Sequence, residues 1–289
     1  MKYTEQPIVF NCINLRLIGI ATQPETPAET GVLIVVGGPQ YRAGSHRQFT
    51  LLARQLAEQG IASMRFDYRG MGDSEGEMRN FEAIDEDIRA AIDTFLKHVP
   101  EVRHVAIWGL CDAASAALYY AHTDARVSGL ILLNPWAHTE AGASRARLKH
   151  YYLSRLMQRS FWTKFLSGKI ELGKSAGDLS KSARSVVTGA GPITSAPTDP
   201  RHGSLGYIER MLDGLKRFRG EALFILSGND LVANEFEHLV SHDSQWKNIC
   251  ASPRITQEKL HEANHTFSTQ PWRGQVEQWT ARWVDKGLS

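Results

Sequence analysis

Short apolar runs alternate with stretches of helical periodicity through the first half of the chain. Residues 32–36 are apolar throughout, as expected for a strand that is covered on both faces. Residues 49–56 then place apolar side chains at helical spacing, and the same order recurs after the strand-like runs 61–66 and 104–108. Strands that alternate with helices are typical of a mostly parallel central sheet flanked by helices, so the pattern predicts an α/β protein.

Further elements complete this predicted sheet. Apolar positions alternate with period two on both sides of residues 13–14, which predicts an edge hairpin. After residue 121 the pattern predicts strands at residues 129–133, 222–227 and 254–256, and an amphipathic last helix at residues 276–284.

The alternation of strands and helices stops between residues 136 and 215. Helical pieces at residues 148–166 and 204–215 flank a stretch rich in Gly, Ser and Pro, and no strand pattern is present. We therefore expect a mainly helical cap, residues 136–215, inserted into an α/β core. The predicted core comprises residues 1–135 and 216–289.

The composition is that of an ordinary globular protein. Of 289 residues, 42% are hydrophobic and 22% are charged, and 33 Lys plus Arg against 31 Asp plus Glu give a net charge of +2. These values exclude a disordered tail, a collagen repeat and a coiled coil, and they give no reason to expect a nucleic acid as partner.

The charge is unevenly distributed along the chain. The predicted cap holds 12 Lys plus Arg and 6 Asp plus Glu, whereas the rest of the chain holds 21 and 25. One interpretation is a solvated basic face. The other is a surface that recruits an anionic acyl carrier, a sugar phosphate or a membrane as a peripheral contact.

Neither a membrane span nor a disulfide framework is predicted. The best apolar run, residues 129–133, is far shorter than a span, and the first residues lack the apolar region of a signal peptide, so we expect a cytoplasmic protein. The three cysteines, Cys12, Cys111 and Cys250, are far apart and lack metal-ligand spacing. The sequence predicts no cofactor and no metal, and it leaves the oligomeric state open.

One cysteine lies where a nucleophile is expected. Gly109-Leu-Cys-Asp-Ala113 follows a predicted strand and precedes a helix of small residues, which is the context of a nucleophile elbow. Small residues are needed there because the backbone at the nucleophile is strained and neighbouring segments of the chain pass close to it. The motif departs from the usual elbow sequence at two positions: cysteine replaces serine, and Ala113 replaces the last glycine.

Two further residues complete a candidate triad. Asp230 follows the predicted strand 222–227, and His265 lies near the C-terminus, so the order is nucleophile, acid, histidine, as expected for this type of protein. We expect His265 to take the thiol proton of Cys111 and Asp230 to orient the imidazole. A helix N-terminus and a histidine are both expected to lower the thiol pKa. The predicted chemistry is acyl transfer through a covalent acyl-cysteine, with thioesters and activated esters favoured over alkyl esters.

An oxyanion hole is predicted beside the thiol. Its donors would be the backbone N–H of Asp112 and one from the loop after residue 36. Pro39 has no N–H, so Gly38 or Gln40 must donate. The Asp112 carboxylate would oppose ionisation of the thiol unless it points away.

Several of these features together resemble the α/β-hydrolase superfamily over nearly the full chain. They are the glycines that end the strand at residues 37–38, the loop at residues 67–74, the elbow, the cap, and the positions of the acid and the histidine. More narrowly, Gly-Gly-Pro-Gln-Tyr-Arg (37–42), Ser-His-Arg-Gln-Phe (45–49) and Gly-Leu-Cys-Asp-Ala (109–113) resemble the exosortase A system-associated hydrolase 1 family.

The resemblance implies an esterase-like or thioesterase-like hydrolase with a bacterial role linked to exopolysaccharide production and protein sorting. It also implies that Asp67, Arg69 and Asp73 form a structural, hydrogen-bonded turn. It supplies neither the acyl group nor the acceptor, so the substrate is a small-molecule or carrier-bound acyl compound.

Two other functions stay open. His261-Glu-Ala-Asn-His265 matches the H-E-x-x-H signature of zinc proteases, which requires a helix so that both histidines share a face. A binding module without catalysis on a hydrolase scaffold is the other, since Cys111, Asp112 and Ala113 all depart from the commonest elbow.

Overall fold

The computed structural model describes residues 2–38, 40–138 and 206–286. The predicted cap therefore falls mainly outside the described residues and stays a prediction. The helix Tyr207–Arg217, which includes the last residues of the predicted cap, is described and packs on the core. No helix in the described ranges is long and apolar enough to cross a lipid bilayer.

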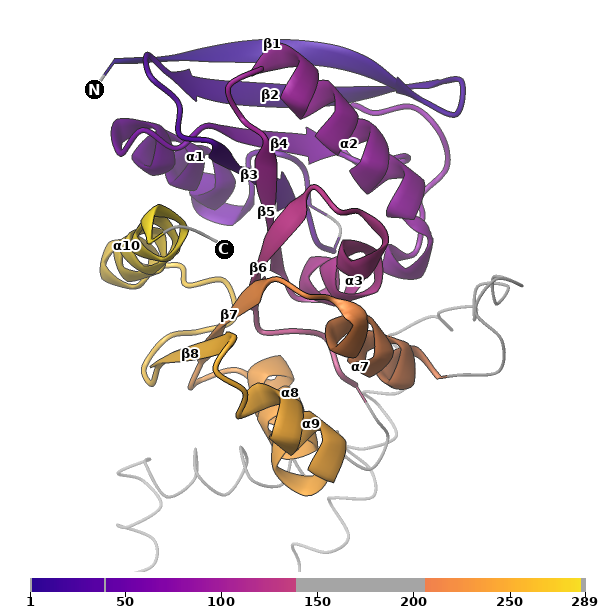
Figure 1. The fold of residues 1–289 in the computed structure, drawn as a ribbon, viewed down its shortest axis with the longest axis vertical. Coiled ribbons are helices and arrows are strands. Elements are labelled where there is room, and N and C mark those ends of the chain that lie inside the picture. The colour runs from indigo at the N-terminus through magenta and orange to yellow at the C-terminus, as the bar shows by residue number, and fades with distance from the viewer. Residues whose placement is uncertain (1, 39, 139–205, 287–289) are drawn as a thin grey trace, which may run out of the picture. The chain divides into compact units, whose positions relative to one another are not determined.

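A single mixed sheet of eight strands runs through the described part of the chain (Figure 1). Its order is β1-β2-β4-β3-β5-β6-β7-β8, with antiparallel pairing of β1 to β2 and of β2 to β4, and parallel pairing elsewhere. The strands are β1 (Tyr3–Cys12), β2 (Leu15–Pro24), β3 (Thr30–Val35), β4 (Ser63–Asp67), β5 (His104–Leu110), β6 (Val127–Leu133), β7 (Glu221–Ser227) and β8 (Ile255–Leu260). This arrangement confirms the predicted α/β class.

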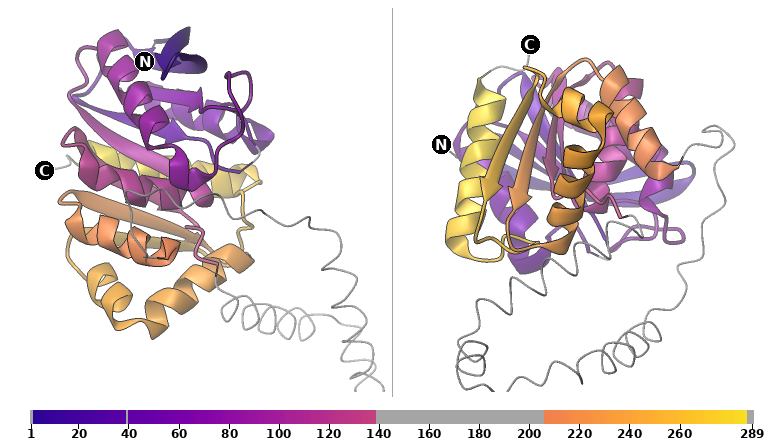
Figure 2. Two further views of the ribbon diagram at one scale, coloured as in Figure 1. Left: turned by 90° about the vertical axis from the view of Figure 1, so that its right-hand side faces the viewer. Right: turned by 90° about the horizontal axis from the view of Figure 1, so that it is seen from below.

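Helices cover both faces of the sheet (Figures 1 and 2). Helices α1 and α10 pack on one face, whereas α2, α3, α7, α8 and α9 contribute to the cluster on the other. The helices are α1 (Gln48–Glu58), α2 (Asp85–His98), α3 (Asp112–Tyr120), α7 (Tyr207–Arg217), α8 (Leu231–His242), α9 (Ser244–Cys250) and α10 (Gln270–Asp285). Short 3-10 turns occur at Ser45–Arg47, Phe81–Ala83 and Ala121–Thr123.

The central strands are apolar throughout because both of their faces are buried. In β5, Val105 and Ile107 enter one hydrophobic cluster, and Ala106 and Trp108 enter the other. Alternate side chains of a strand point to opposite faces, so a strand between two helical layers needs an apolar residue at every position. The predicted strands at residues 32–36 and 104–108 are confirmed for this reason.

The first hairpin shows how local chemistry sets the edge of the sheet. β1 and β2 are joined by Ile13 and Asn14, whose φ angles are 44° and 63°. Two positive φ values in a two-residue loop are those of a type I′ turn, whose twist matches that of the flanking strands. The predicted edge hairpin is confirmed, and its strands are longer than the predicted runs.

Helix α7 approaches α3 very closely. A Cβ added at Gly214 of α7 would overlap the carbonyl oxygen of Leu118 in α3. Glycine at this position therefore lets the two backbones come together. This contact holds the C-terminal half of α3, the helix whose N-cap is Cys111.

A buried ion pair ties the loop after β4 to α2. The Arg69 and Asp87 side chains are 3% and 0% exposed, and the Arg69 backbone N–H, Nε and Nη2 all donate to the Asp87 carboxylate at 2.7–3.0 Å. Arg69 Nη2 also donates to Glu86 at 2.9 Å. Fully hydrogen-bonded charges of this kind are tolerated in a core, whereas a buried charge left alone is not.

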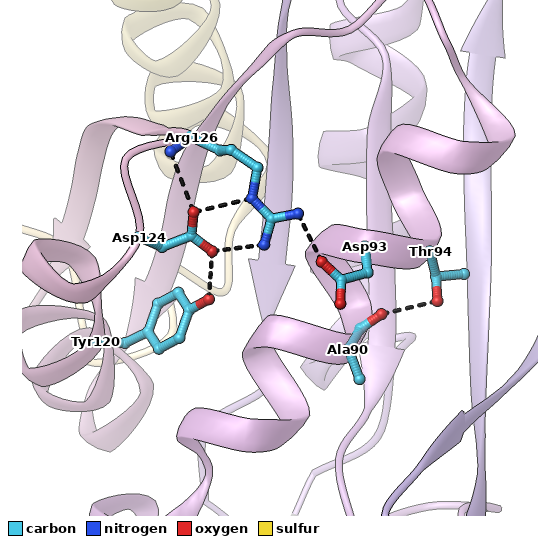
Figure 3. A network of polar contacts seen from close by, with 6 residues as sticks. All are labelled: Ala90, Asp93, Thr94, Tyr120, Asp124 and Arg126. Atoms are coloured by element: carbon cyan, nitrogen blue, oxygen red, sulfur yellow. Dashed lines mark hydrogen bonds and ion pairs between the residues drawn. The ribbon is translucent and has the colours of Figure 1, made fainter.

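A second network lies where β6 begins (Figure 3). Asp124 accepts hydrogen bonds from the Tyr120 hydroxyl at 2.6 Å and from Arg126 Nη2 at 2.7 Å, and Arg126 Nη1 donates to Asp93 of α2 at 2.5 Å. Burial raises the pKa of Asp124, but the Arg126 and Tyr120 donors outweigh it and lower that pKa to about 2. The Arg126–Asp93 arm is exposed, unlike the pair at Arg69.

Removal of Asp87 is expected to destabilise the protein strongly. Asp87→Ala leaves the buried Arg69 with only Glu86 as partner, so urea titration should show a free energy of unfolding lower by about 3–5 kcal/mol. Asp93→Ala breaks an exposed arm and should cost at most ~1 kcal/mol. Similar losses in the two variants would contradict this difference between buried and exposed pairs.

Candidate active site

Cys111 occupies a sharp turn between β5 and α3. Its φ of 62° and ψ of −123° are unusual for a residue other than glycine. A Cβ added at Gly109 would lie 2.6 Å from the Ala113 carbonyl carbon, so the chain before and after the cysteine passes too closely for a side chain there. The strained cysteine flanked by close-packed small residues has the geometry of a nucleophile elbow.

The chain after β3 also passes close to this turn. A Cβ added at Gly37 would overlap the Leu110 carbonyl oxygen and would lie 2.5 Å from Asp112 Oδ1. Glycine at position 37 therefore allows the loop after β3 to reach the start of α3.

Asp230 and His265 form a hydrogen-bonded pair. Asp230 follows β7 and is 8% exposed; its Oδ2 contacts His265 Nδ1 at 2.8 Å and accepts the Ala233 N–H at 3.1 Å, which caps α8. A carboxylate only accepts hydrogen bonds, so Nδ1 is the donor to it, and in a neutral imidazole Nε2 is then an acceptor. His265 lies in the loop between β8 and α10 with one third of its side chain exposed.

Asn134 holds the histidine loop, and no motif in the sequence pointed to it. This fully buried residue follows β6; its Nδ2 donates to the His265 carbonyl oxygen at 3.0 Å and to Ser227 Oγ at 2.8 Å, and its Oδ1 accepts the Ser227 N–H at 2.9 Å. Asn134 thereby links the ends of β6 and β7 to the backbone of the histidine. The only available signal was a polar residue directly after an apolar strand.

Electrostatic interactions connect the elbow with the Asp230–His265 pair. The pKa of Cys111 is raised to about 12. Burial is the largest cause, the Asp112 carboxylate is the second, and the Asp230 carboxylate has a smaller effect. The backbone N–H of Asp112 acts in the opposite direction and lowers this pKa. His265 lowers the pKa of Asp112. Asp230 and His265 are thus in contact, and Cys111 follows the carboxyl end of β5 at the same end of the sheet as the carboxyl ends of β7 and β8, which precede Asp230 and His265.

The expected lowering of the Cys111 pKa is therefore wrong. The helix N-terminus acts in the expected direction through the Asp112 N–H, but burial and two nearby carboxylates outweigh it. The raised pKa favours the protonated thiol in the free protein.

Both N–H groups that were candidate loop donors of the oxyanion hole already donate hydrogen bonds within the protein. The Gly38 N–H donates to Asp112 Oδ1 at 2.7 Å, and the Gln40 N–H donates to the Gly38 carbonyl oxygen at 2.8 Å. Asp112 Oδ1 also accepts the Ala113 N–H at 2.9 Å. The Asp112 side chain therefore points toward the loop that was expected to bind the oxyanion.

A buried carboxylate anchors the same loop. Asp67 accepts the Arg42 N–H at 2.6 Å and the Asp73 N–H at 3.2 Å, and it also contacts the Arg42 guanidinium, which pairs with Asp73 at 2.7 Å. A side chain at Gly72 would overlap the Asp67 carboxylate. The hydrogen-bonded turn expected at residues 67–74 is present, and it holds Arg42 in place.

The helix that a zinc protease signature needs is absent at His261 and His265. Both residues lie in the loop between β8 and α10 and so do not share a helix face. The described residues hold no group of three or more His, Cys, Asp and Glu side chains that could bind a metal ion. The H-E-x-x-H match does not have the structure that its chemistry requires.

Gly37→Ala is expected to damage the site. The added methyl group would force apart the loop after β3 and the start of α3, so the midpoint of thermal unfolding should fall, and any activity that depends on Cys111 should fall by about tenfold or more. Gly274→Ala is the matched control, because a Cβ there meets only Gln270 Nε2, at 3.8 Å. In helix α10 it should stabilise the protein by about 0.5–1 kcal/mol. An unchanged Gly37→Ala protein would contradict the close approach.

Two curated proteins share part of the sequence. An uncharacterized protein of Pseudomonas aeruginosa is 34% identical over 103 residues, which are 34% of this chain and 27% of that protein. The polyketide transferase grgF of Penicillium sp is 35% identical over 92 residues, which are 29% of this chain and 30% of that protein. The chain thus spans less than a third of the length of these relatives.

Solved structures of esterases share the fold over almost the whole chain. The Pyrococcus furiosus esterase Pf2001 has a TM-score of 0.66 at 12% identity and matches 99% of this chain and 92% of that one. Est1E from Butyrivibrio proteoclasticus, solved with ferulic acid bound, has a TM-score of 0.61 at 16% identity and matches 96% and 98%. At these identities the likeness concerns the fold.

A family model described as serine aminopeptidase, S33, matches residues 29–245, which include β3 to β7, the elbow and Asp230. The eight-stranded sheet and the elbow agree with this match. The chain belongs to this family of α/β-hydrolases.

Proposed function

We propose that the protein is an acyl hydrolase or acyltransferase that uses Cys111 as its nucleophile and forms a covalent acyl-cysteine. The observation that carries the proposal is the elbow cysteine, with its φ of 62°, at the same sheet edge as the Asp230–His265 pair. Asp230 orients the imidazole, so that Nε2 is the base that takes the thiol proton. The proposed substrate is an ester or thioester of a small molecule or an acyl carrier.

The first half of the reaction acylates the thiol. His265 Nε2 takes the thiol proton while Sγ bonds to the acyl carbon and the carbonyl oxygen becomes an oxyanion. When the tetrahedral intermediate collapses, the bond to the leaving thiol or alcohol breaks and the imidazolium returns the proton to it. Proton transfer accompanies attack because the pKa of Cys111, about 12, keeps the free thiol protonated.

The second half releases the acyl group. His265 takes a proton from water or from an acceptor hydroxyl, whose oxygen attacks the acyl carbon. Collapse expels Sγ, which regains the proton from His265. Water as acceptor gives hydrolysis, and an alcohol or a sugar hydroxyl gives transfer. The polyketide transferase of Penicillium sp supports transfer, and the esterase structures support hydrolysis.

We further infer a link to exosortase and exopolysaccharide systems, which is supported by the motifs at residues 37–42, 45–49 and 109–113 alone. The basic predicted cap, residues 136–215, would then recruit an anionic carrier, a sugar phosphate or a membrane surface.

A binding module without catalysis is the second candidate function. Two observations favour it: the raised pKa of the Cys111 thiol and the Gly38 N–H that Asp112 already occupies. In that case Cys111 would carry no acyl group at any stage, which separates the two functions experimentally.

Iodoacetamide is expected to add one label, at Cys111, with loss of activity. Cys12 and Cys250 are buried, whereas the Cys111 side chain is partly exposed, so the reagent reaches Cys111 more readily. Because the thiolate is the form that displaces iodide, labelling should accelerate continuously as the pH rises and show no plateau near neutral pH. Mass spectrometry identifies the labelled residue.

Cys111→Ala should abolish both labelling and turnover, and Cys250→Ala should preserve both. An active Cys111→Ala protein would rule out the proposed nucleophile. A folded wild-type protein that no acyl probe labels at Cys111 would favour the binding module.

Thioesters are expected to be better substrates than alkyl esters with the same acyl group. A thiolate leaves a tetrahedral carbon more readily than an alkoxide, so the intermediate from an alkyl ester tends to expel Cys111 again. To correct for intrinsic reactivity, kcat/KM for each substrate is divided by the rate constant of its hydrolysis by hydroxide. The corrected value for the butyryl thioester of N-acetylcysteamine should exceed that for ethyl butyrate by about tenfold or more. Equal or reversed values would contradict the proposed preference.

A further inference from the structure

The Asp112 carboxyl group lies between the nucleophile and the loop after β3. Two backbone donors, the Gly38 N–H at 2.7 Å and the Ala113 N–H at 2.9 Å, reach the same oxygen, Oδ1. Oδ2 receives no hydrogen bond from another described residue, and no described Lys or Arg pairs with this carboxyl. One oxygen is thus fully bonded and the other is available.

The oxyanion of the proposed reaction needs a second donor that the loop does not provide. The N–H of Asp112 is the first donor. The Gly38 N–H is held by Asp112 Oδ1, Pro39 has no N–H, and the Gln40 N–H is held by the Gly38 carbonyl oxygen. Another polar group must therefore take the place of the usual loop donor.

We propose that Asp112 acts as a neutral carboxylic acid whose Oδ2–H is the second hydrogen-bond donor to the oxyanion formed at Cys111. The proposal rests on the proposed function, because the oxyanion arises only when Cys111 attacks a carbonyl carbon. The proton stays on Asp112 throughout: Oδ2–H donates as the oxyanion forms and is released from the contact when the carbonyl reforms. A carboxylic acid that its surroundings keep neutral is an effective donor of this kind.

The hydrogen bonds to Oδ1 lower the pKa of Asp112, and they leave Oδ2 as the oxygen that can carry a proton. In a carboxylic acid one oxygen is a carbonyl acceptor and the other carries the proton. Two N–H donors on Oδ1 define it as the carbonyl oxygen, and the proton then belongs on Oδ2. The Gly38 and Ala113 contacts also fix the orientation of the group, so that no reorganisation is needed when the oxyanion forms.

The surroundings of Asp112 raise its pKa on balance. Burial raises it, whereas the N–H groups of Gly38, Ala113 and Asp112 itself and, more weakly, His265 lower it, and the net shift is upward. Cys111 and Tyr68 lie within its electrostatic reach, since the Asp112 charge raises the pKa of both. The charge of Asp230 also acts at Cys111. Negative charge that develops at Cys111 and on the oxyanion therefore strengthens the preference for a proton on Asp112.

A neutral Asp112 also helps to activate the nucleophile. The carboxylate is one cause of the raised Cys111 pKa, so its protonation removes that opposition to loss of the thiol proton. An ionised Asp112 would instead repel both the thiolate and the oxyanion. Both the nucleophile and the transition state thus favour the neutral acid.

Asp112→Asn and Asp112→Ala test the proposal. Asparagine keeps the Oδ1 acceptor for Gly38 and Ala113 and supplies an Nδ2–H in place of Oδ2–H, so kcat/KM with the butyryl thioester of N-acetylcysteamine should stay within about tenfold of wild type. Alanine removes the donor and should lower kcat/KM by about 10²–10³.

The pH profile separates a proton donor from a structural group. In the wild type kcat/KM should fall on the alkaline side as Asp112 loses its proton, because a carboxylate cannot donate. In Asp112→Asn that alkaline limb should disappear. Thermal unfolding midpoints and iodoacetamide labelling at Cys111 show that each variant retains its fold and its nucleophile.

Two results would overturn the proposal: an Asp112→Ala protein as active as wild type, or an Asp112→Asn protein as inactive as Asp112→Ala although both fold and label. If turnover is too slow to resolve these ratios, the affinity for a propyl trifluoromethyl ketone reports the same contact, since it adds reversibly to Sγ and leaves an oxyanion. Failure of the proposed function shows instead as an active Cys111→Ala protein.

Discussion

The contact between the loop after β3 and the start of α3 is the constraint on which the rest of the site depends. A side chain at Gly37 would overlap Leu110 and Asp112, so these segments meet with no space between them. Because they meet, the Gly38 N–H reaches Asp112 Oδ1, and Asp112 in turn lies against the nucleophile. Arg42 and Asp67 hold the loop from its other end, so its position does not rest on the contact alone.

A second constraint is that the site holds more acidic groups than basic groups. Asp112 and Asp230 both lie within electrostatic reach of Cys111, and the nearby base is His265. Two carboxylates and a thiolate cannot all be ionised in a poorly solvated site with one imidazole. Asp230 accepts hydrogen bonds from His265 and from the N-terminus of α8. An ionised Asp112 would oppose the proposed transfer of the Cys111 proton to His265, because its charge raises the pKa of the thiol.

The sequence predicts the fold well because each central strand can be recognised from its own residues alone. Val105 and Ile107 face one layer of helices while Ala106 and Trp108 face the other, so burial on both faces is visible as an unbroken apolar run. The elbow was likewise predictable, since a strand, small residues and a helix adjoin Cys111 in the chain. The acid and the histidine could be proposed from their order after the strands.

What the sequence could not supply depends on contacts between distant residues. The Gly38 to Asp112 hydrogen bond joins positions 74 apart, and Asn134 supports His265 across 131 positions. The direction of the Cys111 pKa was predicted wrongly for the same reason. A helix N-terminus can be recognised locally, whereas burial and the approach of Asp230 depend on the assembled sheet.

A thiol that stays protonated in the free protein has a chemical advantage. Oxidants and alkylating agents react with the thiolate, so susceptibility follows thiolate character. The raised pKa of Cys111 therefore slows its reaction with such agents near neutral pH, although its side chain is not fully buried. In the proposed reaction the thiolate forms only as Sγ bonds to an acyl carbon beside His265, so the reactive species exists only when a substrate is present. Burial, which opposes the thiolate in the free protein, thereby restricts its reactivity to the acyl group.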